Sequence, residues 1–428
     1  MRQRWVQQGV QNTAPVEVGL REALFKDAAH LLEQLYNDPT LPVPEDAPRP
    51  GEKCHARRVK EMLTLFGWVK LGRNYYYDPR TDQGRAPLDE ALGLVESYSP
   101  AVVRLADRAA ARLGYEAAQA DLKDLAGLQL EGRQIQRLVG VSAPALAQIL
   151  ARPAVAPAGP PIPVFYVEAD GTGVPMRPEE LVGRPGKQPD GSAKTREVKV
   201  GCVFTQTKLD EQGRPMRDYQ STTYVTSFAG AVEFGGQLRQ EALRRGLGRA
   251  QKVLFLGDGA PWVWEVQRVN FPDAVAVLDR YHALEHLQDL CLGLYGEGSP
   301  WVARLKERWV ALWDQDQVEA MIAAARARLA SLGSRATNSL GTQIDYFQKN
   351  KDRMRYGTYR KLGYFYGSGV VEAACKTIVG ARFKQSGMLW GQPGAQNVLA
   401  LRCALLSHRW EQCWSEIHGD NYLDRAAA

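Results

Sequence analysis

The stretch VFYVEAD, residues 164–170, is a compact apolar run that ends on a carboxylate. Such a run is typical of a buried β-strand. Two similar runs follow it along the chain, KVLFLGD at 252–258 and AVAVLD at 274–279. Each of them also ends on an aspartate. The three runs therefore predict strands of one sheet, with Asp170, Asp258 and Asp279 at their carboxyl ends.

The segments between these runs complete an ordered pattern. Residues 196–207, REVKVGCVFTQT, and 218–228, DYQSTTYVTSF, have β-strand character. Residues 230–246 and 260–270 have the spacing of amphipathic helices. The predicted order is three strands, a helix, a strand, a helix and a strand, followed by helices. This order resembles the ribonuclease H fold, an α/β architecture in which three antiparallel strands are extended by two parallel ones.

A Pro/Ala-rich segment, LARPAVAPAGPPIP at 150–163, interrupts both kinds of periodicity and predicts a linker. Residues 1–149 before it are predicted to be mainly helical. Within them, residues 115–141 place Gly127 between two short amphipathic stretches. That spacing suits a DNA-binding helix-turn-helix whose second helix carries Arg133 and Arg137, although a plain helical hairpin has the same pattern.

Composition excludes several classes of protein. The chain has 428 residues, of which 45% are hydrophobic and 24% charged, as in globular proteins of two or three domains. Its formal net charge of +6 permits an anionic partner such as nucleic acid. We expect a cytoplasmic protein with no membrane partner, since no apolar run has the length of a signal peptide or membrane span. Six widely spaced cysteines without a C-x-x-C pair predict neither a disulfide framework nor a zinc site.

A third acid draws attention in GSGVVEAACK, residues 367–376, where Glu372 falls in the predicted first turn of a helix. In the predicted sheet Asp170 and Asp258 are neighbours, and carboxylates held close together repel one another unless cations lie between them. Hard oxygen ligands suit Mg²⁺ or Mn²⁺, and a pair of such ions supports phosphoryl transfer. Taken singly, the aspartates are also good turn formers and Glu372 a good capping charge.

From about Arg57 to Trp410 the sequence resembles bacterial insertion-sequence transposases of the DDE superfamily, specifically the ISKra group, which is distantly similar to Mutator-type elements. The stretches that carry the resemblance are EADGTGVP, LGDGAPWVW, LDRYHALEHL, GSGVVEAACKTIVGARFKQSGMLWGQPGAQNVLALR and, upstream, PLDEALGLVESYSPAVVRLA. The resemblance implies that Asp170, Asp258 and Glu372 are both the catalytic residues and the ligands of two Mg²⁺ or Mn²⁺ ions.

The same resemblance implies the protein's activity, partners and location. A relative of this group would bind the terminal inverted repeats of its element and catalyse strand cleavage and strand transfer into target double-stranded DNA. It would act as a homodimer or larger oligomer on the bacterial nucleoid. The domains implied are a ribonuclease H-like catalytic domain at 164–283 and 357–410, a helical insertion at 284–356 and a C-terminal tail at 411–428. A domesticated relative that only binds DNA is the main alternative.

The sequence departs from the group at its N-terminal side. Relatives often carry paired cysteines there, whereas this chain keeps Cys54 and has YDPR, residues 77–80, at the expected place of a second pair. We therefore expect no zinc-stabilised module.

A competing zinc motif occurs at 282–286, HALEH. His282, Glu285 and His286 match the H-x-x-E-H pattern of a metallopeptidase. Asp279 and His282 also match a D-x-x-H pattern of Mutator-like transposases, which implies an auxiliary role for these two residues.

Basic and aromatic residues predict the DNA surface. Lys and Arg neutralise phosphates and aromatic rings stack on bases, although a solvated surface or, for the tryptophan, a core position explains each residue singly. The candidate DNA-binding residues are Arg57, Arg58, Arg133, Arg137, Lys351, Arg353, Arg355, Arg360, Lys361, Lys376, Arg382, Lys384 and Trp390.

Overall fold

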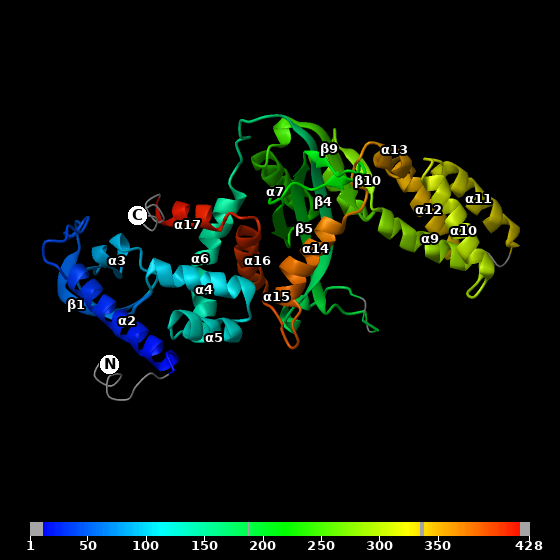
Figure 1. Ribbon diagram of the computed structural model, residues 1–428. Coiled ribbons are helices and arrows are strands. Elements are labelled where there is room, and N and C mark those ends of the chain that lie inside the picture. Colours follow the sequence, from blue (N-terminus) through cyan, green and yellow to red (C-terminus); the bar gives the residue numbers. More distant parts are fainter. Residues whose placement is uncertain (1–11, 187, 190, 334–337, 420–428) are drawn as a thin grey trace. The chain divides into compact units, whose positions relative to one another are not determined.

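The computed structural model describes residues 12–186, 188–189, 191–333 and 338–419 (Figure 1). The chain divides into two compact units. The first covers the described chain up to Ala147 together with the segment from Glu411, and the second covers Gln148–Trp410.

The first unit combines a small antiparallel sheet with helices. Its sheet has the order β1-β2-β3. The last residue pair of the β1–β2 hairpin, next to its turn, is Thr64 with Gly67. The elements are α2 (Ala14–Tyr36), β1 (Lys53–Thr64), β2 (Gly67–Asp78), β3 (Gln83–Arg85), α3 (Pro87–Ala91), α4 (Pro100–Arg112), α5 (Tyr115–Ala126), α6 (Gly132–Ala151, which runs into the second unit) and α17 (Trp410–His418).

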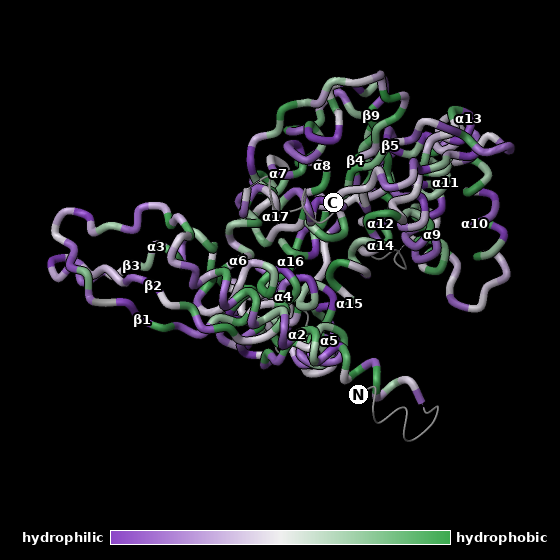
Figure 2. Tube along the Cα trace, turned by 60° about the vertical axis from the view of Figure 1, so that its left-hand side comes forward, coloured by the Kyte–Doolittle hydropathy of each residue, from purple (hydrophilic) through white to green (hydrophobic). Residues whose placement is uncertain are grey.

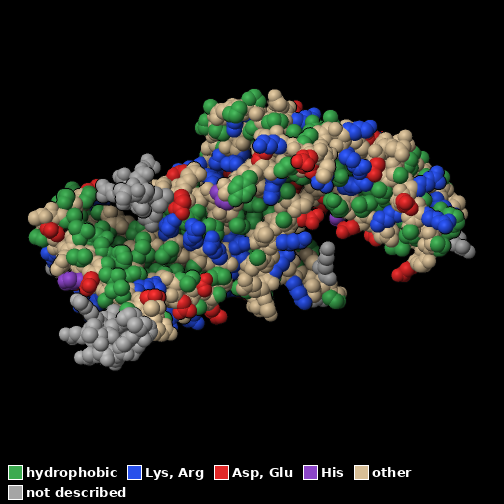
Figure 3. Space-filling view, in the orientation of Figure 1, with side chains coloured by type: hydrophobic (Ala, Val, Ile, Leu, Met, Phe, Trp, Pro, Cys, Tyr) green, Lys and Arg blue, Asp and Glu red, His purple; other side chains and the backbone are tan. Residues whose placement is uncertain are grey.

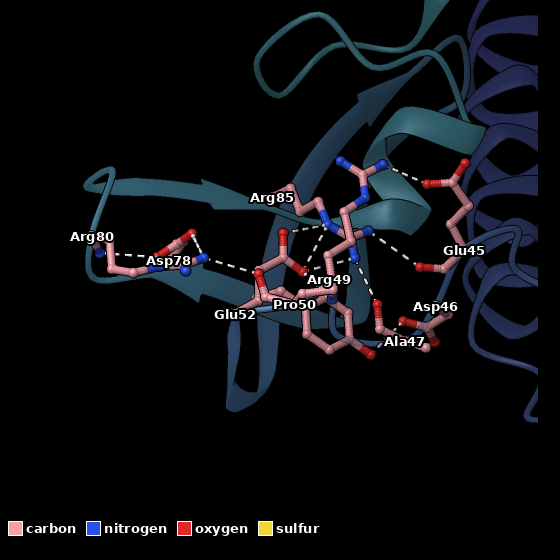
Figure 4. A network of polar contacts seen from close by, with 10 residues as sticks. Glu45, Asp46, Ala47, Arg49, Pro50, Glu52, Asp78, Arg80 and Arg85 are labelled. Carbon is pink, nitrogen blue, oxygen red and sulfur yellow. Dashed lines mark hydrogen bonds and ion pairs between the residues drawn. The ribbon is translucent and has the colours of Figure 1, made fainter.

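A network of ion pairs closes the open end of this sheet, and Figure 4 shows how its side chains converge. Arg85 on β3 binds Glu52, with 2.8 Å between Nε and Oε1. Arg80 binds Asp78 at 2.8 Å and also donates to the Pro50 carbonyl at 2.9 Å. The Arg80 bonds hold the pKa of Asp78 at about 2. Polar side chains of the YDPR segment, residues 77–80, thus join the strand end to the preceding loop.

Helices α5 and α6 flank Gly127, which ends α5 in the left-handed region with φ 71°. Glycine adopts this conformation without a Cβ clash, so the chain reverses there. Ile135 and Leu138 of α6 are buried against the rest of the unit, whereas Arg133 and Arg137 are exposed.

The second unit is built on a mixed five-stranded sheet of order β10-β9-β4-β5-β8. The β4–β5 and β5–β8 pairs are antiparallel, and the β4–β9 and β9–β10 pairs are parallel. The prediction of an α/β unit with three antiparallel and two parallel strands is confirmed. The strands are β4 (Ile162–Pro175), β5 (Thr195–Gln206), β8 (Thr223–Ser227), β9 (Ala250–Gly257) and β10 (Val275–Leu278), with a separate hairpin of β6 (Lys208–Leu209) and β7 (Pro215–Met216).

Helices cover both faces of this sheet (Figure 1). Helices α7 (Ala231–Arg244) and α8 (Pro261–Asn270) pack on one face, and a Cβ on Gly201 of β5 would lie only 2.7 Å from Leu238 of α7. The other face carries α14 (Gly369–Ala374), a π-helical turn (Cys375–Gly380), α15 (Ala381–Phe383) and α16 (Gln392–Leu406).

Further helices lie between β10 and α14. They are α9 (Arg280–Tyr295), α10 (Pro300–Trp313), α11 (Val318–Ser331), α12 (Asn338–Asn350) and α13 (Tyr356–Lys361). Their common core includes Trp313 and Phe347, whose ring centroids are 5.8 Å apart. In Figure 2 the helices mix hydrophilic and hydrophobic positions. Among the described residues, no helix is long and apolar enough to cross a membrane.

A buried acid in the first unit generates a stability prediction. Asp107 of α4 is 0% exposed, and its Oδ2 accepts a hydrogen bond from Ser142 of α6 at 2.5 Å. Burial raises the pKa of Asp107 from 3.8 to about 7. The folded state therefore binds more protons than the unfolded state between these values, so the stability contribution of this group falls as the pH rises from about 4 to 7.

We expect Asp107→Asn to remove this fall, because the amide does not ionise. The two pKa values, about 7 and 3.8, correspond to about 4 kcal/mol of unfolding free energy. About 3 kcal/mol of this difference falls between pH 5 and pH 8, because the unfolded carboxyl is already ionised at pH 5. Urea unfolding at these two pH values measures that part, with the exposed Asp124 of α5 changed to Asn as control. A wild-type protein and an Asp107→Asn variant with the same pH dependence would contradict the assignment.

Candidate active site

The site begins where β4 and β9 run side by side. Ala169 pairs with Gly257 in their parallel register, so the next residues, Asp170 and Asp258, lie beside one another. The prediction that the strand ends at Asp170 is wrong: β4 continues to Pro175 because its pairing with β5 continues through Thr172 and Val174. Asp258 does follow the last residue of β9.

The two aspartates have different local bonds. Asp170 Oδ1 accepts from the Gly171 N–H at 2.6 Å, whereas Asp258 Oδ1 accepts from the Ala260 N–H at 2.9 Å and closes a turn. Burial raises the pKa of Asp170, and the charge of Asp258 raises it further. The charge of Asp258 thus disfavours ionisation of Asp170, which is the condition that a cation between the two side chains would relieve.

Glu372 lies in the first turn of α14, as predicted. Its N–H donates to the Ser368 carbonyl at 3.1 Å. Its carboxylate is half-exposed, with Oε2 4.0 Å from Lys376 Nζ. The π-helical turn follows at Cys375, and turns of this kind are frequent at functional sites.

Cys375 connects this helix to the aspartate pair. Its Sγ donates to Asp170 Oδ2 at 3.4 Å. Burial raises the pKa of the Cys375 thiol, and the charges of Asp170 and, to a smaller extent, Glu372 raise it further. Glu372 is therefore near enough for its charge to be felt at Cys375, although Cys375 is the residue that contacts Asp170.

Carboxylates of this kind are suitable ligands for a hard divalent cation. Asp170 and Asp258 are adjacent and repel one another, which fits such an ion. In the described part of the chain, however, no group of three or more His, Cys, Asp or Glu side chains has the arrangement of a metal site. The structure brings the two aspartates together and places Glu372 on the covering helix without gathering all three.

Asp279 has a structural place in this site. It is fully buried, and its Oδ1 accepts from the His282 N–H at 2.6 Å as the N-cap of α9. Its Oδ2 accepts from the Ser368 hydroxyl at 2.8 Å. The D-x-x-H spacing thus corresponds to a helix cap that also holds the start of α14.

The H-x-x-E-H side chains have other contacts. His282 Nδ1 lies 3.5 Å from Glu285 Oε2. His286 Nδ1 is 2.9 Å from Gln343 Oε1, and its ring stacks on Tyr346 at 3.9 Å between centroids. His286 is therefore engaged by α12.

The candidate DNA-binding residues fall into two groups. Those that are exposed are Arg57, Arg58, Arg133, Arg137, Arg360, Lys361, Lys376 and Lys384, and those that are partly buried are Lys351, Arg353 and Arg355. Several arginines already have partners: Arg137 pairs with Glu96 at 2.8 Å, Arg355 with Glu319 at 2.6 Å and Arg360 with Asp314 at 2.9 Å. Figure 3 shows acidic side chains interspersed with basic ones on the visible face of α9–α13.

Two of the candidates do not face solvent. Arg382 is 0% exposed and Trp390 7%. The Trp390 ring packs against the Phe383 ring, with 4.7 Å between the ring centroids. The Arg382 guanidinium lies over the Trp390 ring, 4.9 Å from its centroid. The Trp390 backbone N–H donates to the Pro175 carbonyl at the end of β4, at 3.1 Å. The prediction that Arg382 and Trp390 contact DNA is therefore wrong for this structure, because both belong to the core.

Sequence reasoning missed Glu168 and Cys375. Glu168 contacts the segment around Glu372, since its Oε2 accepts from the Val371 N–H at 2.8 Å, and Cys375 of that segment contacts Asp170. The available signal was the alternation of strand side chains, which places Glu168 and Asp170 on the same face of β4.

Comparisons with known proteins do not show which family the chain belongs to. No family model matches the sequence, and no curated protein matches it. Among solved structures, the chain is similar to one described as a Drosophila P element transposase strand transfer complex, with a TM-score of 0.26 and 9% identity, over 78% of this chain and 86% of that one. A TM-score this low does not establish a shared fold.

The burial of Trp390 generates a second prediction. Trp390→Ala should lower the unfolding free energy by about 3–5 kcal/mol, because it removes a large side chain from a packed core. Thermal or urea unfolding measures the change. Trp301→Ala is the matched control. Because Trp301 is 56% exposed, this change should lower the unfolding free energy far less. A Trp390→Ala variant of unchanged stability that binds DNA more weakly would instead favour base stacking.

Proposed function

We propose that this protein is a DNA transposase of the DDE type with a ribonuclease H-like catalytic domain. The observation that carries the proposal is the adjacency of Asp170 and Asp258 on β4 and β9, beneath the helix that bears Glu372. The strand order β10-β9-β4-β5-β8, with its antiparallel and parallel halves, supports the ribonuclease H-like assignment.

In this proposal Asp170 and Asp258 hold Mg²⁺ or Mn²⁺, with Glu372 as a third ligand. When bound, two such ions activate an attacking oxygen and stabilise the leaving oxygen of a phosphodiester. The chain's own contribution is to place the carboxylates. Asp170 is fixed by Gly171 and by the thiol of Cys375, and Asp258 by the turn to α8.

The proposed substrate is double-stranded DNA at the ends of an insertion sequence, followed by target DNA. Exposed basic side chains such as Lys361, Lys376 and Lys384 lie in the sequence segments that flank or follow Glu372 and would neutralise phosphates. The exposed side of α6, with Arg133, would contact the element ends in the manner of a recognition helix. We propose that two or more copies act together on the nucleoid.

The acid on α14 provides the main test. We expect Glu372→Gln to keep the fold and DNA binding but to lower strand cleavage by orders of magnitude, because a neutral amide is a poor ligand for a hard cation. Cleavage of a labelled element end in Mg²⁺, run beside a thermal melt, measures both. Loss of a capping charge alone would cost about 0.3–1 kcal/mol and leave cleavage intact.

Glu285→Gln is the matched control, since Glu285 is also a helical acid and its side chain is 78% exposed. It should cleave DNA normally. If Glu285→Gln were inactive and Glu372→Gln active, the proposed catalytic assignment would be wrong.

The recognition helix provides a separate test. Arg133→Ala should lower the slope of log K against log salt for element-end DNA by about one, which is the loss of one phosphate contact. A fluorescence titration at several salt concentrations measures it. Arg214→Ala, which removes an exposed charge from the turn before β7, is the control. Equal slopes for Arg133→Ala and the wild type would remove α6 from the DNA interface.

A further inference from the structure

One face of β4 carries three polar side chains at alternate positions, Tyr166, Glu168 and Asp170. All three bind the segment that runs from Phe365 through α14 to Cys375, the first residue of the π-helical turn. The Tyr166 hydroxyl accepts a hydrogen bond from the Phe365 N–H at 3.1 Å. Glu168 accepts one from the Val371 N–H, and Asp170 accepts one from the Cys375 thiol. The central strand thus holds this segment at three successive points.

Glu168 is the unusual member of the three. It is 0% exposed, and its Oε1 has no hydrogen-bond partner within the described chain. Its Oε2 accepts from the Val371 N–H and also from the thiol of Cys202 on β5, whose Sγ is 3.8 Å away. Burial raises the pKa of Glu168 to about 8. A buried, half-satisfied carboxyl is costly for folding, so a fold-only explanation would favour an apolar residue here.

The hydrogen bond from Val371 explains what Glu168 adds. Ser368 stands at the N-cap position of α14, but its side chain makes no cap hydrogen bond. It donates instead to Asp279 Oδ2 at 2.8 Å. The first turn of the helix is therefore capped from the sheet, by Glu168 Oε2 on Val371 N at 2.8 Å. The residue after Val371 is Glu372.

We propose that Glu168 is a positioning residue for Glu372. Its carboxyl oxygen fixes the first turn of α14 against β4, and the fixed turn sets the place of the Glu372 carboxylate relative to Asp170 and Asp258. Glu168 does not contact substrate. Asp279, through Ser368, anchors the same turn from α9. This inference rests on the proposed function of Glu372.

Three variants separate positioning from stability. Glu168→Gln keeps an acceptor for the Val371 N–H, Glu168→Met removes the acceptor at similar volume, and Glu168→Asp keeps the acid but shortens its reach. Tyr356→Phe is the matched control, because it removes a buried hydrogen bond, from Tyr356 to the Leu278 carbonyl at 3.1 Å, that does not involve α14.

The first measurement is hydrogen exchange in the full-length protein without metal or DNA. Glu168→Met and Glu168→Asp should speed exchange of the amides in residues 369–375 by about tenfold or more, the effect of losing one buried hydrogen bond. Glu168→Gln and Tyr356→Phe should leave this segment within about threefold of the wild type. Unchanged exchange in both Glu168→Met and Glu168→Asp would overturn the inference.

The second measurement is cleavage of a labelled element end at fixed Mg²⁺. Glu168→Met and Glu168→Asp should cleave at least about tenfold more slowly at unchanged DNA affinity, and Glu168→Gln should recover most of the rate. Slow cleavage by Glu168→Gln as well, despite normal exchange at 369–375, would contradict positioning through Val371.

The two measurements also separate this inference from the proposed function. If Glu372→Gln is inactive but Glu168→Met cleaves like the wild type, the inference fails and the proposed function stands. If the wild type does not cleave, or Glu372→Gln cleaves fully, the proposed function fails, and with it the catalytic part of the inference. If Glu168→Met does not fold, Glu168→Asp decides, because it retains the acid at this position.

Discussion

The parallel pairing of β4 with β9 is the constraint on which the site depends. β4 is the central strand of the sheet, antiparallel to β5 on one side and parallel to β9 on the other. The parallel register brings Asp170 and Asp258 to the same level. A shift of one residue would turn the Asp170 side chain to the face covered by α7 and α8, away from α14.

The same strand explains why the helix that bears Glu372 lies where it does. Apolar contacts of Val371, Ala374 and Ile378 bury the helix on the sheet, but such contacts allow a helix to slide or rotate by small amounts. Directional bonds from β4 remove that freedom. Glu168 and Asp170 each bind one point of the helix, at Val371 and Cys375. The site therefore depends on buried polar groups whose cost the apolar packing must offset.

Much of the second unit could be predicted from sequence because its strands are short apolar runs with aspartates and turns after them. The order of strands, the position of Glu372 in a first helical turn and the neighbouring aspartates follow from local pattern together with the resemblance. The end of β4 could not be predicted, since DGTG at 170–173, after Ala169, has the sequence of a turn, while its pairing with β5 is a tertiary effect. Burial of Arg382 and Trp390 is tertiary in the same way: a basic residue near an aromatic one has the same sequence pattern on a DNA surface and in a core.

The charges in the segment before α14 would limit how the proposed DNA substrate is bound. Arg355 and Arg360 are paired with Glu319 and Asp314, so a phosphate would have to displace a carboxylate to reach either guanidinium. The exposed Lys384 is placed differently. Lys384 Nζ donates to the Thr172 hydroxyl at 2.7 Å, just past Asp170 on β4, and gives up only a neutral partner when it turns to a phosphate. Phosphate binding near the aspartates would therefore begin at lysine, a flexible point charge, and the geometric precision of the site would come from the carboxylates that β4 holds in place.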